Sequence, residues 1–183
     1  TTADHVFALN DPRRFGFVDL VDTAKLDAWP AFSVMGPEPL GDGLTVDHLR
    51  AALKGRKQAI KLLLLDQRIV AGLGNIYVCE ALWRSGLSPK RQAGTLVRKN
   101  GAPTPKCEQL AVDIRSVIAD AINAGGSSLR DHVQTDGSLG YFQHSFAVYD
   151  REGAACAKAN CEGTIKRIIQ SGRSTFYCSV CQR

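Results

Sequence analysis

Residues 156–181 read CAKANCEGTIKRIIQSGRSTFYCSVC and contain four of the six cysteines in the chain. Four residues separate Cys156 from Cys161, two separate Cys178 from Cys181, and sixteen lie between the two pairs. Two close pairs with a spacer of this length are typical of a four-thiolate zinc site, because each pair can grip a tetrahedral ion from a short turn. The sequence therefore predicts one structural zinc ion held by these four cysteines.

The spacer between the pairs is predicted to be a two-stranded hairpin. Residues 164–168 alternate as a strand does, Ser171-Gly172 forms the turn, and residues 174–177 are strand formers. The alternatives are two disulfides or four unrelated cysteines. No signal peptide is recognisable and we expect an intracellular protein, which disfavours disulfides. Because a 28-residue tail buries too little apolar surface to fold alone, the metal would supply its folding free energy.

The same tail carries most of the excess positive charge of the chain. Residues 156–183 contain five basic side chains and one acidic one, whereas the preceding 155 residues contain 18 basic and 17 acidic ones. The net charge is +5 and the pI is about 9.0. A small, rigid, basic hairpin favours contact with nucleic acid phosphates. The alternative is a solvated basic surface, and charge alone leaves the two interpretations nearly even.

The bulk composition is that of a globular protein. The 183 residues are enough for one or two domains, and the 44% hydrophobic content supports a buried core. No apolar run approaches the ~20 residues of a membrane span. The two cysteines outside the zinc pattern, Cys79 and Cys107, fall in predicted helices, and we interpret them as small buried hydrophobes.

The first residues are typical of the edge of a sheet. Residues 5–9 and 15–21 are strand-like, and residues 10–14 form a turn in which Asn and Asp precede Pro. Two strands alone are at best marginally stable. Because the chain also opens on Thr1-Thr2 without an initiator Met, we expect it to be truncated, with the other strands of this sheet absent.

Helices are predicted to follow a loop over residues 30–43. Thr45 can cap a helix over residues 46–53, and a second helix is expected over residues 56–66. A long amphipathic helix starts at Thr104-Pro105, carries an apolar stripe from Leu110 to Ile122, and ends at residues 123–126.

Three further segments are candidate sites. The first is Gly72-Leu73-Gly74-Asn75, whose two glycines end the preceding helix, and Asn75 is placed to cap a helix over residues 76–85. The N-terminus of that helix could bind an anion. The alternative is that the segment is only a tight packing turn. The turn Pro12-Arg13-Arg14-Phe15 could enter a DNA groove, although a surface turn with Phe15 in a sheet core is favoured without further context. The loop over residues 127–141 has a length usually reserved for function. No arrangement of His, Ser or Asp indicates a catalytic site, so the residues alone indicate a zinc-stabilised nucleic-acid-binding chain.

Six motifs in this order resemble bacterial formamidopyrimidine-DNA glycosylases, over nearly the whole chain from Asp11 onward. They are Asp11-Pro12-Arg13-Arg14-Phe15-Gly16, Met35-Gly36-Pro37-Glu38-Pro39-Leu40, Gly72-Leu73-Gly74-Asn75-Ile76-Tyr77 with Glu80-Ala81-Leu82, Gly125-Gly126-Ser127-Ser128-Leu129-Arg130-Asp131, Asp136-Gly137-Ser138-Leu139-Gly140-Tyr141-Phe142, and Gly172-Arg173-Ser174-Thr175-Phe176-Tyr177-Cys178 with Cys181-Gln182.

The resemblance implies an α+β fold in three parts. Residues 1–35 would be the last strands of an N-terminal catalytic β-sandwich, residues 36–146 a helix–two-turn–helix DNA-binding domain with a lesion loop, and residues 147–183 a β-hairpin zinc finger. Proteins of this family act in base-excision repair. They excise oxidised purines (8-oxoguanine and formamidopyrimidines) after flipping the nucleotide out of the duplex, and then cleave the abasic site by β/δ-elimination.

The resemblance also implies a role for individual residues. Arg13 would face the estranged cytosine, and Phe15 would wedge into the base stack. Phosphates flanking the flipped nucleotide would be bound by Asn75 and Arg173, with Tyr149 assisting. The lesion loop, with Ser128, Arg130 and Tyr141, would cover the damaged base, and zinc would be held by Cys156, Cys161, Cys178 and Cys181.

The start of the chain departs from the family pattern. The family's nucleophile is an N-terminal proline amine, followed by a catalytic glutamate, and the amine forms a Schiff base with the sugar. Here Thr1 and Thr2 stand first, and the proline, the glutamate, a catalytic lysine and one intercalating residue would lie in a region this chain lacks. We therefore expect no catalytic residue in this chain, which would bind DNA without excising bases. The first cysteine pair also has four intervening residues where many relatives have two.

Two other functions stay open at this point. The chain could be a non-enzymatic zinc-finger module that binds nucleic acid, or it could belong to the related glycosylases that remove oxidised pyrimidines. The Arg-Arg-Phe turn and the long loop over residues 127–141 favour the purine enzyme. A redox disulfide protein would instead contain no zinc. We expect double-stranded damaged DNA as the partner, no membrane, a monomer, and a bacterial cytoplasmic protein associated with the nucleoid.

Overall fold

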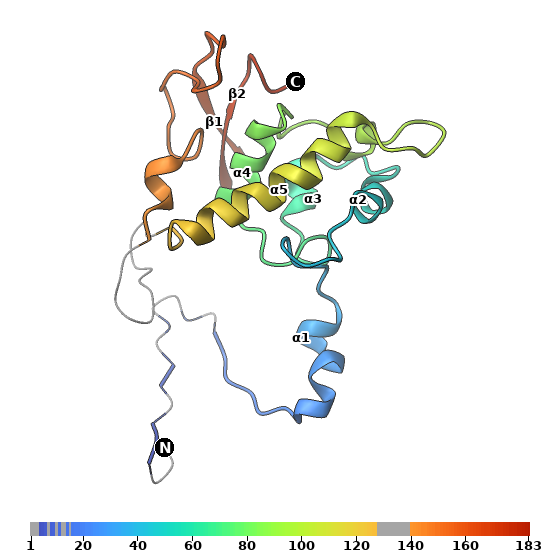
Figure 1. Cartoon of the computed structure of the whole chain (residues 1–183), viewed down its shortest axis with the longest axis vertical. Coiled ribbons are helices and arrows are strands. Elements are labelled where there is room, and N and C mark those ends of the chain that lie inside the picture. The colour runs from blue at the N-terminus through green and yellow to red at the C-terminus, as the bar shows by residue number, and fades with distance from the viewer. Residues whose placement is uncertain (1–3, 7, 10, 12–13, 15, 128–139) are drawn as a thin grey trace. The chain divides into compact units, whose positions relative to one another are not determined.

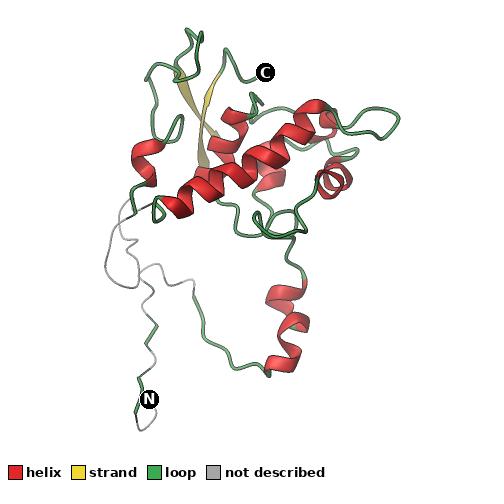
Figure 2. Ribbon diagram, viewed as in Figure 1, coloured by secondary structure: helices red, strands yellow, loops and turns green. Residues whose placement is uncertain are grey.

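The structure is a computed structural model that describes every residue except 1–3, 7, 10, 12–13, 15 and 128–139 (Figure 1). The chain divides into two compact units, Thr1–Val34 and Met35–Arg183. The second unit contains the helices and strands that carry the candidate site, and Figure 2 colours them by type.

The first unit contains two short helices. The 3-10 helix η1, Thr23–Ala28, begins where the Asp22 carboxylate accepts a hydrogen bond from the Ala24 amide at 3.0 Å. The helix α1, Pro30–Ser33, has a proline at its first position, where the missing amide costs nothing. The loop expected over residues 30–43 therefore begins with a helical turn.

The strands expected in the first unit are absent from its described residues. No strand is assigned to the described residues between 4 and 22, and the side chains of Phe17, Val18 and Leu20 are 66%, 79% and 97% exposed. A strand needs a neighbour to receive its backbone hydrogen bonds, and β propensity alone does not supply one. The described residues of the expected strands 5–9 and 15–21 therefore form no strand, and the assignment of residues 1–35 to a β-sandwich stays a prediction.

Helices form the body of the second unit. In chain order they are α2 (Val46–Leu53), α3 (Ile60–Leu64), α4 (Asn75–Arg84), the 3-10 helix η2 (Ala93–Leu96), α5 (Pro105–Asn123) and the 3-10 helix η3 (Phe142–Ser145). The longest, α5, packs along α4 (Figure 1). In the described part of the chain, no helix combines the length and the apolar character that crossing a bilayer requires.

Local sequence sets two helix starts as predicted. Thr45 Oγ1 accepts a hydrogen bond from the His48 amide at 3.0 Å, and Thr104 Oγ1 accepts one from the Cys107 amide at 3.3 Å. Both are threonine N-caps, which satisfy amides that have no acceptor within the helix. The boundaries of α2 and α5 therefore agree with the sequence analysis.

The helix α3 is shorter than the predicted span of residues 56–66. The backbone of the residues before α3 forms tertiary hydrogen bonds instead of helical ones. The carbonyls of Arg56 and Gln58 accept from the amides of Gly94 and Ala93 at 2.8 and 2.9 Å. These bonds fix residues 56–59 in an extended path beside the segment that precedes η2. The local helical pattern is overridden by this packing.

The main core lies between α2, α3, α4 and α5. It contains the fully buried side chains of Leu49, Leu53, Leu64, Val78, Leu82, Leu110, Ile114 and Val117. The predicted stripe of α5 faces this core, except that Ile122 at its end is 61% exposed. Cys79 and Cys107 are buried as expected, and burial raises the pKa of both thiols.

The two strands that the structure assigns in the described residues form the predicted hairpin. They are β1 (Ile165–Gln170) and β2 (Arg173–Cys178), which pair antiparallel from Ile165↔Cys178 to Gln170↔Arg173. Ser171 and Gly172 make the turn with φ of 47° and 72°, the left-handed conformation of a two-residue hairpin loop. The hairpin packs its β2 strand against α4 (Figure 1).

Candidate metal centre and nucleic-acid interface

The four cysteines of residues 156–181 meet at one point. Their Sγ atoms all lie within 4.8 Å of one another, and the separations from Cys156 to Cys181 and from Cys161 to Cys178 are 3.7 Å. A tetrahedral ion with bonds of about 2.3 Å to sulfur places two sulfurs about 3.8 Å apart. The cluster therefore fits one zinc ion, and four protein ligands make the site structural, because no position stays open for water or substrate.

Backbone amides in the turns that carry the paired cysteines help to orient their sulfurs. The amides of Lys158 and Gly163 donate hydrogen bonds to the sulfurs of Cys156 and Cys161. The Trp83 indole also donates to Cys156 Sγ, at 3.4 Å. Burial would raise the pKa of the Cys156 thiol, but the hydrogen bonds from Trp83, Lys158, Cys181 and Cys161 together lower it to about 7. The thiolate form of Cys156 is favoured accordingly, whereas burial raises the pKa of Cys181.

A glycine is required beside the cluster. A Cβ added at Gly163 would lie 2.5 Å from Cys178 Sγ and 2.9 Å from the side chain of Val180. Both distances are too short for real contacts, so the second turn passes over the first only because residue 163 has no side chain. No role was predicted for this glycine from the sequence.

The long first turn of the cluster also binds the end of α4. Lys158 Nζ donates to the carbonyls of Trp83 and Arg84 at 3.3 and 3.1 Å, and Lys106 Nζ from α5 donates to those of Ser85 and Gly86 at 3.2 and 2.7 Å. Cations are favoured at this end of a helix, where carbonyls lack intrahelical partners. The four-residue spacing between Cys156 and Cys161 thus has a structural use.

A buried carboxylate holds the segment that enters the zinc hairpin. Glu80, on α4, is 1% exposed, and it accepts hydrogen bonds from the amides of Ala147, Val148 and Tyr149 at 2.9, 2.9 and 2.8 Å. Glu80 belongs to one of the sequence motifs, but no role was predicted for it. Its signal was an acidic residue among the apolar positions of a helix.

Asn75 lies at the first position of α4 and does not cap it. The N-cap is Gly74, in an extended conformation (φ −93°, ψ 177°), so the predicted capping role of Asn75 is wrong. The Asn75 side chain reaches across to the hairpin, where Nδ2 donates to the Ser174 carbonyl at 2.9 Å and to the Tyr149 hydroxyl at 3.4 Å. Tertiary partners have drawn the amide away from its own helix.

A buried lysine reaches the same point on the hairpin. Lys61, on α3, is fully buried, and its Nζ donates to Thr175 Oγ1 at 2.6 Å and to the Ser174 carbonyl at 3.3 Å. Burial lowers the pKa of Lys61, and the charge of the nearby Arg173 lowers it further. Arg173 itself is exposed at the start of β2. Asn75, Tyr149 and Arg173, three of the predicted DNA contacts, therefore gather around one end of the hairpin, and Lys61 was missed.

The turn before α4 is open on its outer side. A Cβ at Gly72 or at Gly74 would meet no heavy atom of the described residues within 4 Å. Gly72 has a φ of 72°, which favours glycine, but Gly74 has a φ that any residue adopts. Because Gly74 has no side chain, the first amides of α4 stay accessible, and such helix N-termini commonly bind anions.

Other predicted contacts stand apart or outside the described residues. Arg13, Phe15, Ser128 and Arg130 lie outside them. Tyr141 is 66% exposed at the end of the predicted loop over residues 127–141, where its amide donates to the Ala124 carbonyl at 2.8 Å. A hollow of about 470 Å³ lies beside this base, lined by Gly72, Tyr77, Ile118, Ala121, Ile122, Gly125 and Gly126.

The arrangement defines a helix–two-turn–helix protein with a four-cysteine zinc hairpin. The sequence profile of the H2TH domain of formamidopyrimidine-DNA glycosylase matches residues 35–133. The formamidopyrimidine-DNA glycosylase of Agrobacterium fabrum is 62% identical over 174 residues, which are 95% of this chain and 58% of that protein. The protein of the same name from Rhizobium etli (strain CIAT 652) is 63% identical over 174 residues, 95% of this chain and 59% of that protein.

Solved structures agree with the sequence relatives. The MutM (Fpg) protein from Thermus thermophilus superposes with a TM-score of 0.81 and 39% identity, over 94% of this chain and 62% of that one. The Lactococcus lactis Fpg in complex with DNA containing an abasic site superposes with a TM-score of 0.76 and 32% identity, over 89% of this chain and 57% of that one. This chain belongs to the formamidopyrimidine-DNA glycosylase family, and it spans somewhat less than three fifths of the length of the relatives from Agrobacterium and Rhizobium.

Proposed function

We propose that this chain is the damaged-DNA-binding part of a base-excision repair enzyme, a bifunctional DNA glycosylase and AP lyase that excises oxidised purines and cleaves the abasic site by β/δ-elimination. One observation carries the proposal. Asn75, Tyr149 and Arg173 gather at the start of β2, beside the open turn at the N-terminus of α4. Relatives of the same family, from Lactococcus lactis, have been crystallised with DNA containing Fapy-dG or an abasic site.

The site would bind the DNA backbone of a distorted duplex. Arg173 supplies an exposed charge, and the first amides of α4, beside an open turn, supply hydrogen-bond donors. Asn75 would bind the same stretch of phosphates, and Tyr149 would hold Asn75 in place through its hydroxyl. Double-stranded damaged DNA is therefore the partner we propose, bound by a monomer.

The remaining contacts follow from the family resemblance. Arg13 would face the base opposite the lesion, and Phe15 would fill the gap in the stack. Ser128, Arg130 and Tyr141 would close over the flipped base. The three-part domain division at residues 35 and 146 belongs to this proposal too.

Zinc would support DNA binding without taking part in the chemistry. Its four cysteine ligands, Cys156, Cys161, Cys178 and Cys181, fill the tetrahedron. The ion would hold the start of β1 to the end of β2, and so stabilise the hairpin whose other end carries Arg173. We also propose a bacterial cytoplasmic location, with the protein associated with the nucleoid through its DNA contacts.

The 183-residue chain would bind damaged DNA without excising the base. These residues match less than three fifths of the length of the relatives, and the N-terminal proline amine that family members use as the nucleophile would belong to the unmatched part. Borohydride reduction traps the Schiff base that such an amine forms with the sugar. Incubating the chain with a duplex containing 8-oxoguanine opposite cytosine and borohydride should give no covalent adduct, while the same duplex is bound in a mobility-shift assay. A covalent adduct would contradict the first statement, and absence of binding the second.

Two other functions make different predictions. A non-enzymatic zinc-finger module would bind undamaged and damaged duplexes equally. A glycosylase of oxidised pyrimidines would prefer a duplex containing an oxidised thymine over one containing 8-oxoguanine. The names of the relatives from Agrobacterium and Rhizobium favour formamidopyrimidine substrates over oxidised pyrimidines.

A further inference from the structure

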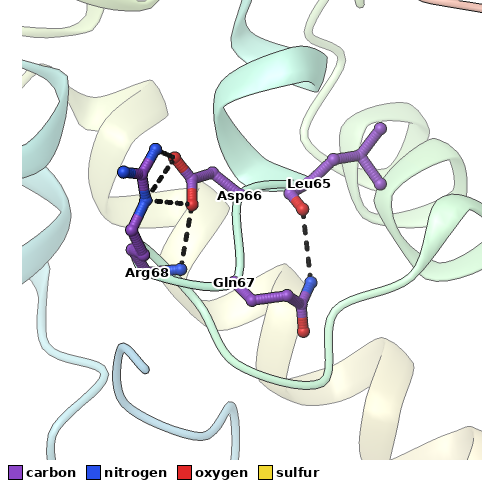
Figure 3. A network of polar contacts seen from close by, with 4 residues as sticks. All are labelled: Leu65, Asp66, Gln67 and Arg68. Carbon is purple, nitrogen blue, oxygen red and sulfur yellow. Dashed lines mark hydrogen bonds and ion pairs between the residues drawn. The ribbon is translucent and has the colours of Figure 1, made fainter. Parts of the chain in front are cut away.

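The turn that follows α3 contains two separate hydrogen-bond networks, one between Asp66 and Arg68 and one made by the Gln67 side chain (Figure 3). The Asp66 carboxylate accepts hydrogen bonds from the Arg68 amide at 3.0 Å, from its Nε at 2.9 Å and from its Nη2 at 2.7 Å. This network closes on itself within three residues, and the Arg68 side chain is 72% exposed. These hydrogen bonds therefore stabilise the turn itself.

Gln67 lies between Asp66 and Arg68 in the sequence, and its side chain bonds both to the end of α3 and to the turn that precedes α4. Its Oε1 accepts a hydrogen bond from the Gly72 amide at 2.7 Å. Its Nε2 donates to the Leu65 carbonyl at 3.2 Å, as drawn in Figure 3, and to the Leu73 carbonyl at 3.3 Å. One side-chain amide thus ties the end of α3 to the two residues that precede the N-cap of α4.

Other contacts hold residues 68–71, the first half of the segment between α3 and α4. The Ala71 amide donates to the Pro37 carbonyl at 3.1 Å, and the His48 ring bonds the Ile69 carbonyl at 2.8 Å. Gly36 passes so close that a Cβ there would lie 2.6 Å from the Arg68 carbonyl oxygen. These contacts brace residues 68–71, and Gln67 continues the support to residues 72 and 73.

The supported residues decide where α4 begins. Gly72 has a φ of 72° and an open outer side, so its own packing does little to restrict it. Gly74 follows as the N-cap, and Asn75 is the first residue of α4. Fixing the Gly72 amide and the Leu73 carbonyl therefore fixes the direction in which Asn75 and the first amides of the helix point.

We propose that Gln67 is a positioning residue of the DNA-phosphate site, acting through the Gly72–Gly74 turn on Asn75. The inference rests on the proposed DNA-binding function, because its effect is exerted on the residue that would bind phosphate. Gln67 needs no contact with DNA for this role. Its side-chain amide acts by setting the backbone of the turn in the free protein.

A double-mutant cycle in the 183-residue chain tests this coupling. The variants are Gln67→Met, which keeps the length and the neutral charge but removes all three hydrogen bonds, Asn75→Ala, and the two together. Gln92→Met, the same substitution at an exposed glutamine following α4, is the control. The probe is a duplex containing a tetrahydrofuran abasic analogue opposite cytosine, and the readout is the dissociation constant from fluorescence anisotropy.

Gln67→Met should weaken binding roughly three- to tenfold, the range for losing partly exposed hydrogen bonds, while Gln92→Met binds as the original chain does. In the Asn75→Ala background the same change should weaken binding less than about twofold, because the two residues act in series. Unchanged binding by Gln67→Met overturns the inference. An equal loss in both backgrounds overturns it as well, since that result indicates a general loss of structure.

A second measurement separates this inference from the proposed function. If Asn75→Ala leaves binding unchanged, the proposed phosphate contact of Asn75 fails. Amide hydrogen exchange at Gly72 then decides the structural part. Exchange that is faster in Gln67→Met than in Gln92→Met supports the positioning of the turn, and equal exchange in the two variants overturns it.

Discussion

Glu80 shows how one buried side chain can connect two parts of a fold. Its carboxylate accepts three backbone amides at the entrance to the zinc hairpin. Glu80→Ala would leave those amides buried without acceptors, at about 1–3 kcal/mol each, so we expect a loss of about 3 kcal/mol or more in the free energy of unfolding. Glu80→Gln should cost less, because one oxygen still accepts from Val148 and Tyr149. Urea unfolding measures both.

The control for Glu80 is Glu38→Gln, at an exposed position of the same unit. Its free energy of unfolding should stay within about 0.5 kcal/mol of the original chain. If Glu80→Ala unfolded at the same urea concentration as Glu38→Gln, the three hydrogen bonds would not stabilise the entrance to the hairpin.

Lys61 gives the stability a pH dependence with a definite sign. Burial lowers its pKa below the ordinary 10.5, and the Arg173 charge adds to this. Between the lowered pKa and 10.5, the unfolded chain binds more protons than the folded chain, so the free energy of unfolding rises with pH across that window. At lower pH, both states are protonated and the cost of the buried charge is fully present.

Lys61→Met isolates this contribution, because methionine fills a similar volume and does not titrate. The difference in the free energy of unfolding, original chain minus variant, should increase as the pH is raised toward 10.5. Urea titrations at several pH values measure it. A difference that stays constant with pH would show that Lys61 titrates alike in the folded and unfolded chains.

The sequence predicts those residues whose partners are close in the chain. Thr45, Thr104 and the hairpin turn at Ser171-Gly172 behave as expected, because their hydrogen bonds or dihedral angles are local. Asn75 was misassigned as a cap because its partner, Ser174, lies 99 residues away. Gln67 carries no periodic or spacing signal, and the only signal of Glu80 is its acidic side chain among the apolar positions of a helix, since the partners of both residues are backbone groups.

At the scale of elements, the same distinction separates the hairpin from the first unit. The hairpin can be predicted because its two strands adjoin and its cysteines have metal-site spacing. Residues 15–21 have similar β propensity, but the described ones form no strand, because propensity does not provide a partner. The shortening of α3 has the same kind of cause, since hydrogen bonds from Ala93 and Gly94 hold the residues before it.

Metal binding and hairpin formation should be lost together. Cys178→Ser removes one thiolate from the cluster, so zinc should fall well below one equivalent, and amides of β1 and β2 should lose protection from hydrogen exchange. Cys107→Ala, which removes a buried thiol outside the cluster, should keep one equivalent of zinc. Hairpin amides that remain protected in metal-free Cys178→Ser would contradict the view that zinc stabilises the hairpin.

At the scale of the whole molecule, α4 connects the helices to the zinc hairpin. Its first residue, Asn75, binds the start of β2, its middle residue, Glu80, binds the chain entering the hairpin, and its last carbonyls bind Lys158 of the metal-binding turn. These contacts place the exposed Arg173 beside the open N-terminus of α4. We propose that the zinc ion acts at a distance, by keeping Arg173 where a phosphate could reach it.

The most direct test of this account is the salt dependence of DNA binding by Arg173→Ala. Fluorescence anisotropy with the abasic-analogue duplex, over about 50–200 mM salt, gives the dissociation constant and its slope with salt concentration. We expect Arg173→Ala to bind more weakly, to lower the slope by about 1, and to retain one equivalent of zinc, while Lys99→Ala, at an exposed lysine outside the site, changes neither quantity. Binding by Arg173→Ala with the original affinity and slope would contradict the account.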